Sequence, residues 1–320
     1  MGGTAEKRPR GRAESAGGPV KPSVAAVVVT HARPAELRVV VAALISQSRR
    51  PDAIVVFDNN SQLPAAEILA DFAGQVSIVR SPKNLGGAGG FAAGLQEALA
   101  LEADWIWLMD DDAVPEPDSL RELLAALALA PAQVGALCCA VLEDGLLAPR
   151  HRRLFSRLSG FEKPIGLPRY QEALVAIDTG SFVGFLVSSR AVREVGLPEA
   201  EFFLAYDDTE YSLRLQARGW PLFLAPRSRI NHLRTPGSRL RASLFGGKHY
   251  FNIRNRLVVK RRHARFSRLA ACDGVCYGFL LWLLSRGFSR PGGLRLLGRA
   301  LRDGLAGRLG AFPAEFRELR

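Results

Sequence analysis

The sequence predicts an α/β fold built on a doubly wound, mainly parallel sheet. Strand-like and helix-like segments alternate four times between residues 24 and 110, which is the pattern of strands joined by helical crossovers. The strand-like segments are almost wholly apolar and rich in valine and isoleucine, as expected where both faces of a sheet are covered. Hydrophobic residues form 48% of the 320-residue chain, which is enough for a large core.

The first half of the chain supplies these elements in order. Residues 24–30 (Val-Ala-Ala-Val-Val-Val-Thr) predict a buried strand, and Pro34 suits the first turn of a helix that continues to residue 44. The next elements are a strand at 52–57, a helix at 64–72 and a strand at 76–80. The glycine-rich run at 84–90 is expected to be a loop that opens a helix over 91–101. A fourth strand, at 105–109, leads directly into three aspartates.

The second half is less regular. Residues 143–168 show no period and are rich in Arg, Gly and Pro, so we expect a mobile segment over the site. The other expected elements are a helix that starts near Pro115 and Asp118, strands at 134–142, 173–178, 181–188 and 222–225, a helix at 209–217, and a loop that holds His232. From residue 249 onward the pattern is helical and basic.

Positive charge is concentrated in residues 248–320. This region holds 16 Lys and Arg against 4 Asp and Glu, a balance equal to the +12 formal charge of the whole chain. Such a region suits nucleic acid or an anionic membrane surface. Residues 276–284 are aromatic and apolar with flanking arginines, which favours a helix that lies in the membrane interface, because a span needs roughly 20 apolar residues. A core helix packed on the larger domain is the other interpretation, and both stay open.

These features divide the chain into three parts. Residues 1–22 are polar, Gly-rich and basic, and without an apolar run they predict a disordered tail rather than a secretory signal. Residues 23–247 form the α/β domain, and residues 248–320 form the helical basic region. The four cysteines have neither disulfide-framework nor zinc-site spacing, so we expect reduced thiols in a cytosolic setting.

The three aspartates that follow the fourth strand are the strongest chemical signal. Asp110, Asp111 and Asp112 repel one another and could not be buried unpaired. Ligands of open α/β sheets bind at the carboxyl ends of the strands, so a cation at this position is expected. Oxygen ligands suit Mg²⁺ or Mn²⁺, which complete their coordination with substrate phosphates. The alternative is an acidic turn that caps the next helix.

Other motifs each have a functional and a purely structural interpretation. Gly87, Gly89 and Ala92 loosely fit a dinucleotide-binding pattern, but that pattern belongs after the first strand and not here. Asp58 ends the second strand, where it could accept a hydrogen bond from a base or a ribose or could simply initiate a turn. His232 could be a surface residue or an additional ligand of a carboxylate-bound metal.

A second acidic pair lies at a predicted helix start. Asp207 and Asp208 would raise each other's proton affinity, which suits a general base. The structural alternative is capping, because Asp207 and Glu210 have the spacing of a capping box.

Taken together, these motifs resemble the inverting glycosyltransferases of family 2, with their GT-A domain. Within that family the chain looks like the bacterial galactofuranosyltransferases that build cell-wall galactan. The resemblance covers residues 23–259. It is carried by Val-Val-Val-Thr-His-Ala-Arg-Pro, Val-Phe-Asp-Asn-Asn-Ser, Asn-Leu-Gly-Gly-Ala-Gly-Gly-Phe, Ala-Asp-Trp-Ile-Trp-Leu-Met-Asp-Asp-Asp, Asp-Asp-Thr-Glu-Tyr and Tyr-Phe-Asn-Ile-Arg-Asn-Arg.

The resemblance implies a role for each candidate residue. Asp208 would take the acceptor proton, and Asp207 would hold the acceptor or share that task. The metal would be held by Asp110, Asp112 and His232. The residues expected to contact the nucleotide part of the donor are Thr30, Asp58, Asn84, Gly87, Asp110 and Asp111.

The expected function is metal-dependent, inverting transfer of galactofuranose from UDP-galactofuranose. Mn²⁺ or Mg²⁺ is the expected cofactor, and a polyprenyl-linked glycan at the inner leaflet is the expected acceptor. The enzyme would be cytoplasmic and peripheral on the inner face of the membrane, with no nucleic acid partner. A sibling that uses dTDP-rhamnose is the first alternative, and a nucleotide-binding dehydrogenase or a non-enzymatic membrane-binding module is the remote one. The acceptor, the linkage position and the oligomeric state stay open.

Overall fold

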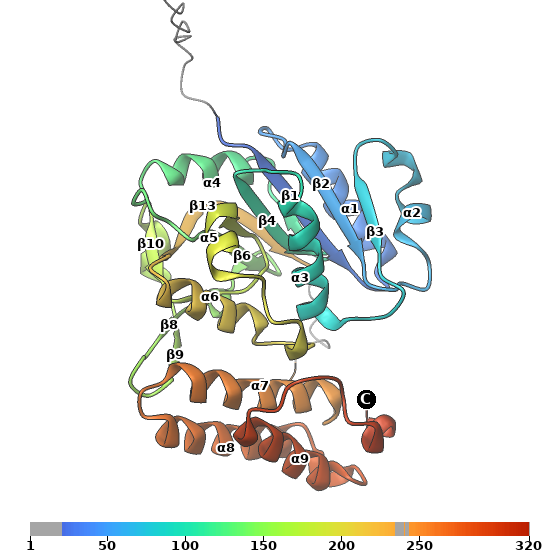
Figure 1. The fold of residues 1–320 in the computed structure, drawn as a ribbon, viewed down its shortest axis with the longest axis vertical. Coiled ribbons are helices and arrows are strands. Elements are labelled where there is room, and N and C mark those ends of the chain that lie inside the picture. Colours follow the sequence, from blue (N-terminus) through green and yellow to red (C-terminus); the bar gives the residue numbers. More distant parts are fainter. Residues whose placement is uncertain (1–20, 234–239, 241–242, 320) are drawn as a thin grey trace, which may run out of the picture.

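The computed structural model describes residues 21–233, 240 and 243–319. The predicted tail over residues 1–22 lies outside the described residues, except for its last two positions. A twisted sheet with helices on both faces forms the larger part of the molecule, and three C-terminal helices pack beneath it (Figure 1). This arrangement agrees with the predicted α/β architecture.

One half of the sheet is parallel and contains the predicted early strands. β1 (Val24–Thr30), β2 (Ala53–Asp58), β3 (Ser77–Arg80) and β4 (Trp105–Asp110) are neighbours in the order β4-β1-β2-β3. Every residue of β1 is buried, as its valine-rich run predicts for a central parallel strand. The carboxyl ends of these strands therefore meet at one edge of the sheet.

The other half of the sheet is mixed. β6 (Ala136–Glu143) and β13 (Leu222–His232) are parallel, whereas β12 (Phe185–Ser188) runs antiparallel between β4 and β6. β10 (Val175–Ile177) pairs with β13 at the outer edge, and the short β5 (Ala113–Pro115) pairs with the end of β13. The sheet is thus mostly parallel, as predicted, with antiparallel additions that the sequence pattern does not reveal.

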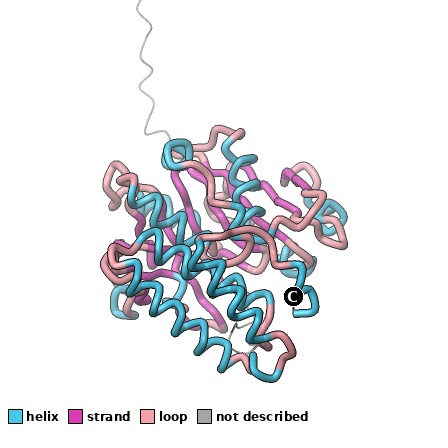
Figure 2. Tube along the Cα trace, turned by 60° about the horizontal axis from the view of Figure 1, so that its bottom comes forward, coloured by secondary structure: helices cyan, strands magenta, loops and turns pink. Residues whose placement is uncertain are grey.

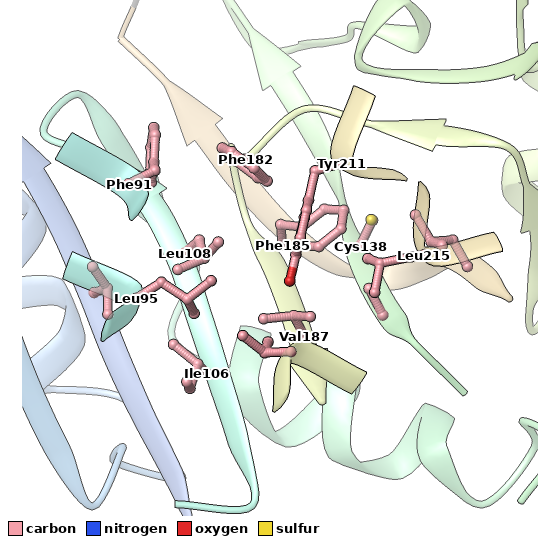
Figure 3. Packing of buried hydrophobic residues seen from close by; sticks show 14 of the residues in the cluster. Phe91, Leu95, Ile106, Leu108, Cys138, Phe182, Phe185, Val187, Tyr211 and Leu215 are labelled. Carbon is pink, nitrogen blue, oxygen red and sulfur yellow. The ribbon is translucent and has the colours of Figure 1, made fainter. Parts of the chain in front are cut away.

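Helices cover the two faces of the sheet according to the alternation of its side chains. The first face is covered by α1 (Pro34–Ile45), α2 (Ala65–Ile68) and α4 (Ser119–Leu127), which pack on Val28, Val56 and Trp107. The opposite face is covered by α3 (Gly86–Leu99), α5 (Ser189–Val195) and α6 (Asp207–Ala217). Figure 3 shows this second core, where Phe91 and Tyr211 flank Leu108 and Phe182.

The glycine run predicted as a loop is instead the first part of helix α3, so the expected start at residue 91 is wrong. A Cβ atom at Gly90 would lie 2.6 Å from a methyl carbon of Val29, and one at Gly94 would lie 2.7 Å from a methyl carbon of Val27. The glycines let the helix backbone approach β1 closely. Their lack of side chains serves packing, which overrides the low helix propensity of glycine.

The segment at 143–168 also differs from the prediction, because it contains regular structure. β8 (Arg152–Phe155) pairs with β9 (Glu162–Pro164) and with β11 (Thr179–Gly180) to form a small antiparallel sheet. The guanidinium of the fully buried Arg152 donates to the carbonyl oxygens of Cys139 (2.9 Å) and Val183 (2.6 Å). These contacts tie the small sheet to the main one.

Several smaller predictions also need correction. The helix expected at 64–72 is divided into α2 and a single 3₁₀ turn, Ala70–Phe72, and helix α5 was not predicted. The strand expected at 222–225 continues through a bulge between Ala225 and Arg229 and ends at His232. His232 is therefore the last residue of a strand and not part of a loop.

The C-terminal region contains α7 (Gly247–His263), α8 (Ser267–Leu284) and α9 (Gly293–Ala306), and α7 packs against both of the others (Figure 2). One face of α8, with Gly274, Gly278 and Leu281, is buried against its neighbours, while the opposite face is exposed. With 18 residues and a mean hydropathy of 1.3, α8 is the one helix in the described part that could cross a membrane by length and composition; only 22% of it is buried.

Candidate active site

The predicted site residues converge at the edge of the sheet where β1, β2 and β4 end. The strand register places Thr30 beside Asp58, and Val29 beside Asp110. Asp111 and Asp112 follow Asp110 directly in the sequence. The backbone N–H of Asp111 donates to the carbonyl oxygen of Val29, which keeps this turn at the end of β1. This is the edge at which open α/β sheets bind their ligands.

Asp111 turns back into the protein. Its Oδ2 accepts hydrogen bonds from the Thr30 hydroxyl (2.8 Å) and from the backbone N–H of His31 (3.0 Å), and its Oδ1 accepts one from Arg33 (3.2 Å). Asp111 thereby holds the loop that follows β1. Its role toward the donor, like that of the buried Thr30, stays a prediction.

Arg33 is a site residue that the sequence reasoning missed. Its half-exposed guanidinium forms ion pairs with both Asp111 and Asp112. Its position in the sequence could have identified it. Arg33 comes three residues after the end of β1, and the aspartates follow the end of the neighbouring parallel strand β4, so the two segments lie at the same edge of the sheet. It supplies part of the positive charge that the aspartates require.

The residues for which a metal-binding role is expected lie together in a second group. Ligand atoms of Asp110, Asp112 and His232 all lie within 4.8 Å of one another. His232 reaches this place because β13 pairs with β5, which sets His232 opposite Ala113, the residue after Asp112. Its Nε2 lies 3.3 Å from Asp112 Oδ1.

The electrostatics of this cluster fit a divalent cation. Burial, followed by repulsion from Asp112, raises the pKa of Asp110 to about 7. Burial also raises the pKa of Asp112, but the neighbouring imidazole of His232, with the charge of Arg33, outweighs this effect, so that the pKa is lowered. Within the described residues, no well-formed hydrogen bond reaches the buried Asp112 Oδ1. An orphaned carboxylate oxygen beside a second carboxylate and an imidazole is a donor set that Mn²⁺ or Mg²⁺ accepts.

On the β2 side, Asp58 is fully buried. Its two oxygens accept hydrogen bonds from the backbone N–H groups of Ser61 (2.8 Å) and Ala65 (3.0 Å). These bonds shape the loop between β2 and α2, in line with the turn interpretation. A contact between Asp58 and a base or ribose stays a prediction.

Asn84 belongs to a polar network beside Asp58. Its Oδ1 accepts from Gly86 N–H (2.7 Å) and from Asn59 Nδ2 (3.2 Å), while its Nδ2 lies 3.1 Å from His31 Nε2. Asn59 and His31 were not selected from the sequence, although both follow strand ends at this edge. Gly87 lies in the first turn of α3, and a Cβ atom there would meet no atom of the described residues within 4 Å. Packing within that part of the chain therefore does not require glycine at this position.

The second acidic pair opens helix α6, but it does not cap the helix. The N-cap residue is Tyr206, without a side-chain cap bond, and Glu210 pairs with Arg214 at 3.0 Å. The capping-box interpretation of Asp207 and Glu210 is therefore wrong. Asp208 Oδ1 instead accepts from the backbone N–H of Thr209 at 2.6 Å.

Both carboxyl groups have an elevated proton affinity. Burial and then the charge of Asp208 raise the pKa of Asp207 well above the ordinary value, and the charge of Asp110 contributes as well. Burial raises the pKa of Asp208, although the hydrogen bonds from Thr209 and the charge of Arg153 oppose it. A carboxyl group with a raised pKa is suited to general-base chemistry near neutral pH.

Asp208 lines a cavity of about 580 Å³. The cavity lies between the small sheet, the start of α6 and the C-terminal helices. The residues that line it include Arg150, His151, Arg153, Glu162, Ser181, Tyr206, Asp208, Asn252, Arg256 and Tyr277. Its charged and aromatic lining suits a polyol such as a sugar.

The loop before Asp207 is held in an uncommon conformation. Phe203, Ala205 and Tyr206 all have positive φ angles of 65–67°, which costs roughly 1–3 kcal/mol for each non-glycine residue. The buried side-chain amide of Asn255 compensates, because its Nδ2 donates to the carbonyl oxygens of Phe202 (3.0 Å), Leu204 (2.8 Å) and Ala205 (2.8 Å). Asn255 lies in the Tyr-Phe-Asn-Ile-Arg-Asn-Arg segment, whose purpose in the site the sequence did not reveal.

Sequence comparison identifies relatives of the chain. A sequence model described as Glycosyl transferase family 2 matches residues 25–191. Galactofuranosyltransferase GlfT1 of Mycobacterium tuberculosis (strain ATCC 25618 / H37Rv) is 37% identical over 206 residues, which cover 62% of this chain and 66% of the relative. GlfT1 of Mycolicibacterium smegmatis is 35% identical over 201 residues, which cover 62% and 67%. The match thus spans about two thirds of the length of these relatives.

Solved structures share the fold. GalNAc-T7, solved with UDP, GalNAc and Mn²⁺, superposes with a TM-score of 0.63 at 15% identity, over 80% of this chain and 51% of that one. S. aureus TarS 1-349 superposes with a TM-score of 0.57 at 13% identity, over 89% and 80%. At these identities the similarity establishes the fold, which is GT-A. The chain belongs to glycosyl transferase family 2 and is a glycosyltransferase with a GT-A fold.

Proposed function

We propose that this glycosyltransferase moves galactofuranose from UDP-galactofuranose to a glycan acceptor, with inversion at the anomeric carbon. The main support for the proposal is that a candidate metal-binding cluster and a cavity with a candidate general base lie next to each other at one edge of the sheet. The Asp110–Asp112–His232 cluster fits a diphosphate-bound cation, and Asp208 lines the adjoining cavity. The identity to two galactofuranosyltransferases supports the choice of sugar.

The donor would bind along the carboxyl ends of β1, β2 and β4. Thr30, Asp58 and Asn84 lie on the side proposed for the uridine, and the diphosphate would reach the cluster formed by Asp110 and Asp112. A bound Mn²⁺ or Mg²⁺ supplies positive charge that stabilises the departing diphosphate.

The transfer step would use Asp208 as the general base. Its unprotonated carboxylate removes the proton from an acceptor hydroxyl as that oxygen forms a bond to the anomeric carbon. The bond from this carbon to the diphosphate oxygen breaks on the opposite face, and UDP leaves with the electron pair. Direct displacement inverts the configuration and requires no covalent enzyme intermediate. Asp207 would hold the acceptor or share the proton.

The proposed acceptor is a polyprenyl-linked glycan at the inner leaflet. The exposed face of α8 supports this choice, because Leu269, Phe279, Leu280 and Leu283 are 48–65% exposed. The arginines at 265, 268, 286 and 290 lie at the two ends of this helix. An apolar face bordered by arginines suits a helix that lies on an anionic membrane. The glycan would then reach the cavity beside Asp208, whose wall includes Asn252 of α7 and Tyr277 of α8.

A donor screen tests the proposal. Purified enzyme with Mn²⁺ and a short synthetic galactoside acceptor would be incubated separately with UDP-galactofuranose, UDP-galactopyranose and dTDP-rhamnose. Mass spectrometry should show a hexose added only from UDP-galactofuranose. Transfer from dTDP-rhamnose instead would assign the chain to the rhamnosyltransferase alternative.

A further inference from the structure

A chain of polar contacts runs from the metal cluster to the wall of the cavity beside Asp208. His232 Nδ1 lies 3.3 Å from Glu143 Oε1, and the same oxygen lies 2.9 Å from His151 Nε2. His151 Nδ1 in turn lies 2.8 Å from the hydroxyl of Ser181. His151 and Ser181 both line the cavity. Neither Glu143 nor His151 has a role in the proposed reaction.

Glu143 reaches this position through the strand register. β13 is parallel to β6, with Asn231 opposite Leu142, so the next residue of each strand, His232 and Glu143, meet at the same edge. The Glu143 side chain is 5% exposed and forms an ion pair with Arg150. A buried carboxylate that is paired with an arginine stays ionised, because its charge is compensated.

An ionised carboxylate only accepts hydrogen bonds, and this fixes one proton on each of the two imidazoles. Each nitrogen that faces Glu143 must carry a proton, which places the proton of a neutral His232 on Nδ1. In this neutral form, the Nε2 of His232 carries a lone pair that faces Asp112 Oδ1 at 3.3 Å, an oxygen without a hydrogen bond from the described residues. Two such acceptors repel each other unless a proton or a cation lies between them, and together they offer a nitrogen and an oxygen ligand to a metal ion.

We propose that Glu143 is a positioning residue that holds His232 in the tautomer and orientation in which Nε2 binds the divalent cation. The proposal deepens the proposed function, on whose metal dependence it rests. A carboxylate that accepts the second N–H of a metal-binding histidine is a common outer partner, and its loss typically weakens metal binding about 10–100-fold. Arg150 offsets the charge of Glu143, which favours this positioning role over a second cation between Glu143 and His151.

The test is the affinity for Mn²⁺, measured by the electron paramagnetic resonance signal of the free ion in the presence of UDP. Glu143→Gln keeps the size of the side chain but removes the charge and one acceptor oxygen. We expect its Mn²⁺ affinity to fall about 10–100-fold. Asp303→Asn is the matched control, because Asp303 is an equally buried carboxylate within the C-terminal helices, and it should leave the affinity unchanged.

A double variant separates positioning from general loosening of the site. In a His232→Ala background, Glu143→Gln should cause no additional loss of Mn²⁺ affinity, because its effect passes through His232. If Glu143→Gln does not fold, Glu143→Asp, which keeps the charge but shortens the reach, should show the same direction of change. Folding would be checked by circular dichroism.

Three results would overturn parts of the account separately. Wild-type affinity in a folded Glu143→Gln, together with a loss in His232→Ala, would remove the positioning role and leave the metal site intact. Additive losses in the double variant would also contradict positioning. Unchanged affinity in both His232→Ala and Asp112→Asn would show that the metal part of the proposed function is wrong.

Discussion

The three adjacent aspartates differ sharply in what each one contacts. Asp111 is held by Thr30, His31 and Arg33, whereas Asp112 presents an oxygen without a hydrogen bond toward His232. Asp110 contributes the second carboxylate, with a pKa raised by burial and by Asp112. The sequence identified the acidic cluster, but only the side-chain directions separate the proposed metal ligands, Asp110 and Asp112, from Asp111, which shapes the loop.

Asp112→Asn should nearly abolish turnover, because a neutral amide is a poorer ligand and leaves the diphosphate charge uncompensated. Turnover in the wild type should stop with chelator and return with added Mn²⁺ or Mg²⁺. The exposed Asp71→Asn serves as a control and should be neutral. Full activity of the wild type in excess chelator would contradict the assignment.

Asp208→Asn should lower kcat by about 10²–10⁴-fold, the usual contribution of a positioned base. UDP binding, measured by calorimetry, should barely change, since Asp208 lines the cavity that we propose for the acceptor. A defect confined to UDP affinity would move Asp208 to the donor side of the site.

Activity should also fall at acidic pH for a definite reason. Asp208 accepts a proton only when ionised, and burial raises its pKa above the ordinary 3.8. The rate should therefore decline as the pH drops through that raised pKa. Glu162→Gln removes a neighbouring negative charge that raises this pKa, so the acidic limb of the kcat profile should move to lower pH. A limb that stays in place or moves upward would contradict Asp208 as the titrating base.

At the scale of elements, long-range contacts position the catalytic candidates. The strained loop at 203–206 lies directly before Asp207, and the side-chain amide of Asn255 in α7 donates hydrogen bonds to the carbonyl oxygens of residues 202, 204 and 205. Asn255→Ala should therefore lower kcat by more than tenfold while leaving UDP affinity unchanged. Tyr250→Phe, which removes a buried hydrogen bond elsewhere in α7, should lower only the melting temperature. Equal kinetics in the two variants would show that the loop keeps its shape without Asn255.

One face of helix α8 packs on its neighbours, as the core interpretation expects, whereas contact of the exposed face with a membrane stays a prediction. Trp282 is half-buried against Gly287 and Phe288, so Phe279 and Leu283 are better probes of the exposed face. Phe279→Glu with Leu283→Glu should abolish the salt-resistant fraction that sediments with anionic vesicles. The control pair Leu101→Glu with Leu129→Glu, equally exposed after α3 and α4, should still sediment. Unchanged sedimentation of the α8 variant would place any membrane contact elsewhere.

At the scale of the whole molecule, local patterns predicted the elements that are buried throughout. The valine run of β1 and the apolar run of β4 each predict a buried strand without any information on distant contacts. The position of the three aspartates at the sheet edge is predicted as well, because they come directly after β4. The path of β13 could not be predicted, because Pro226, Arg227 and Ser228 interrupt its apolar pattern at the bulge. The contacts of His232 with Glu143 and of Asn255 with the 203–206 loop join residues 89 and about 50 positions apart. Such pairs depend on tertiary packing, which a single sequence does not display.

The most direct test of the central claim is nuclear magnetic resonance of the product formed from UDP-galactofuranose in the presence of Mn²⁺. A single displacement assisted by Asp208 predicts a galactofuranosyl product whose anomeric configuration is opposite to that of the donor, with no product when chelator is added. A product that retains the configuration, or one that forms at full rate without metal, would contradict the account.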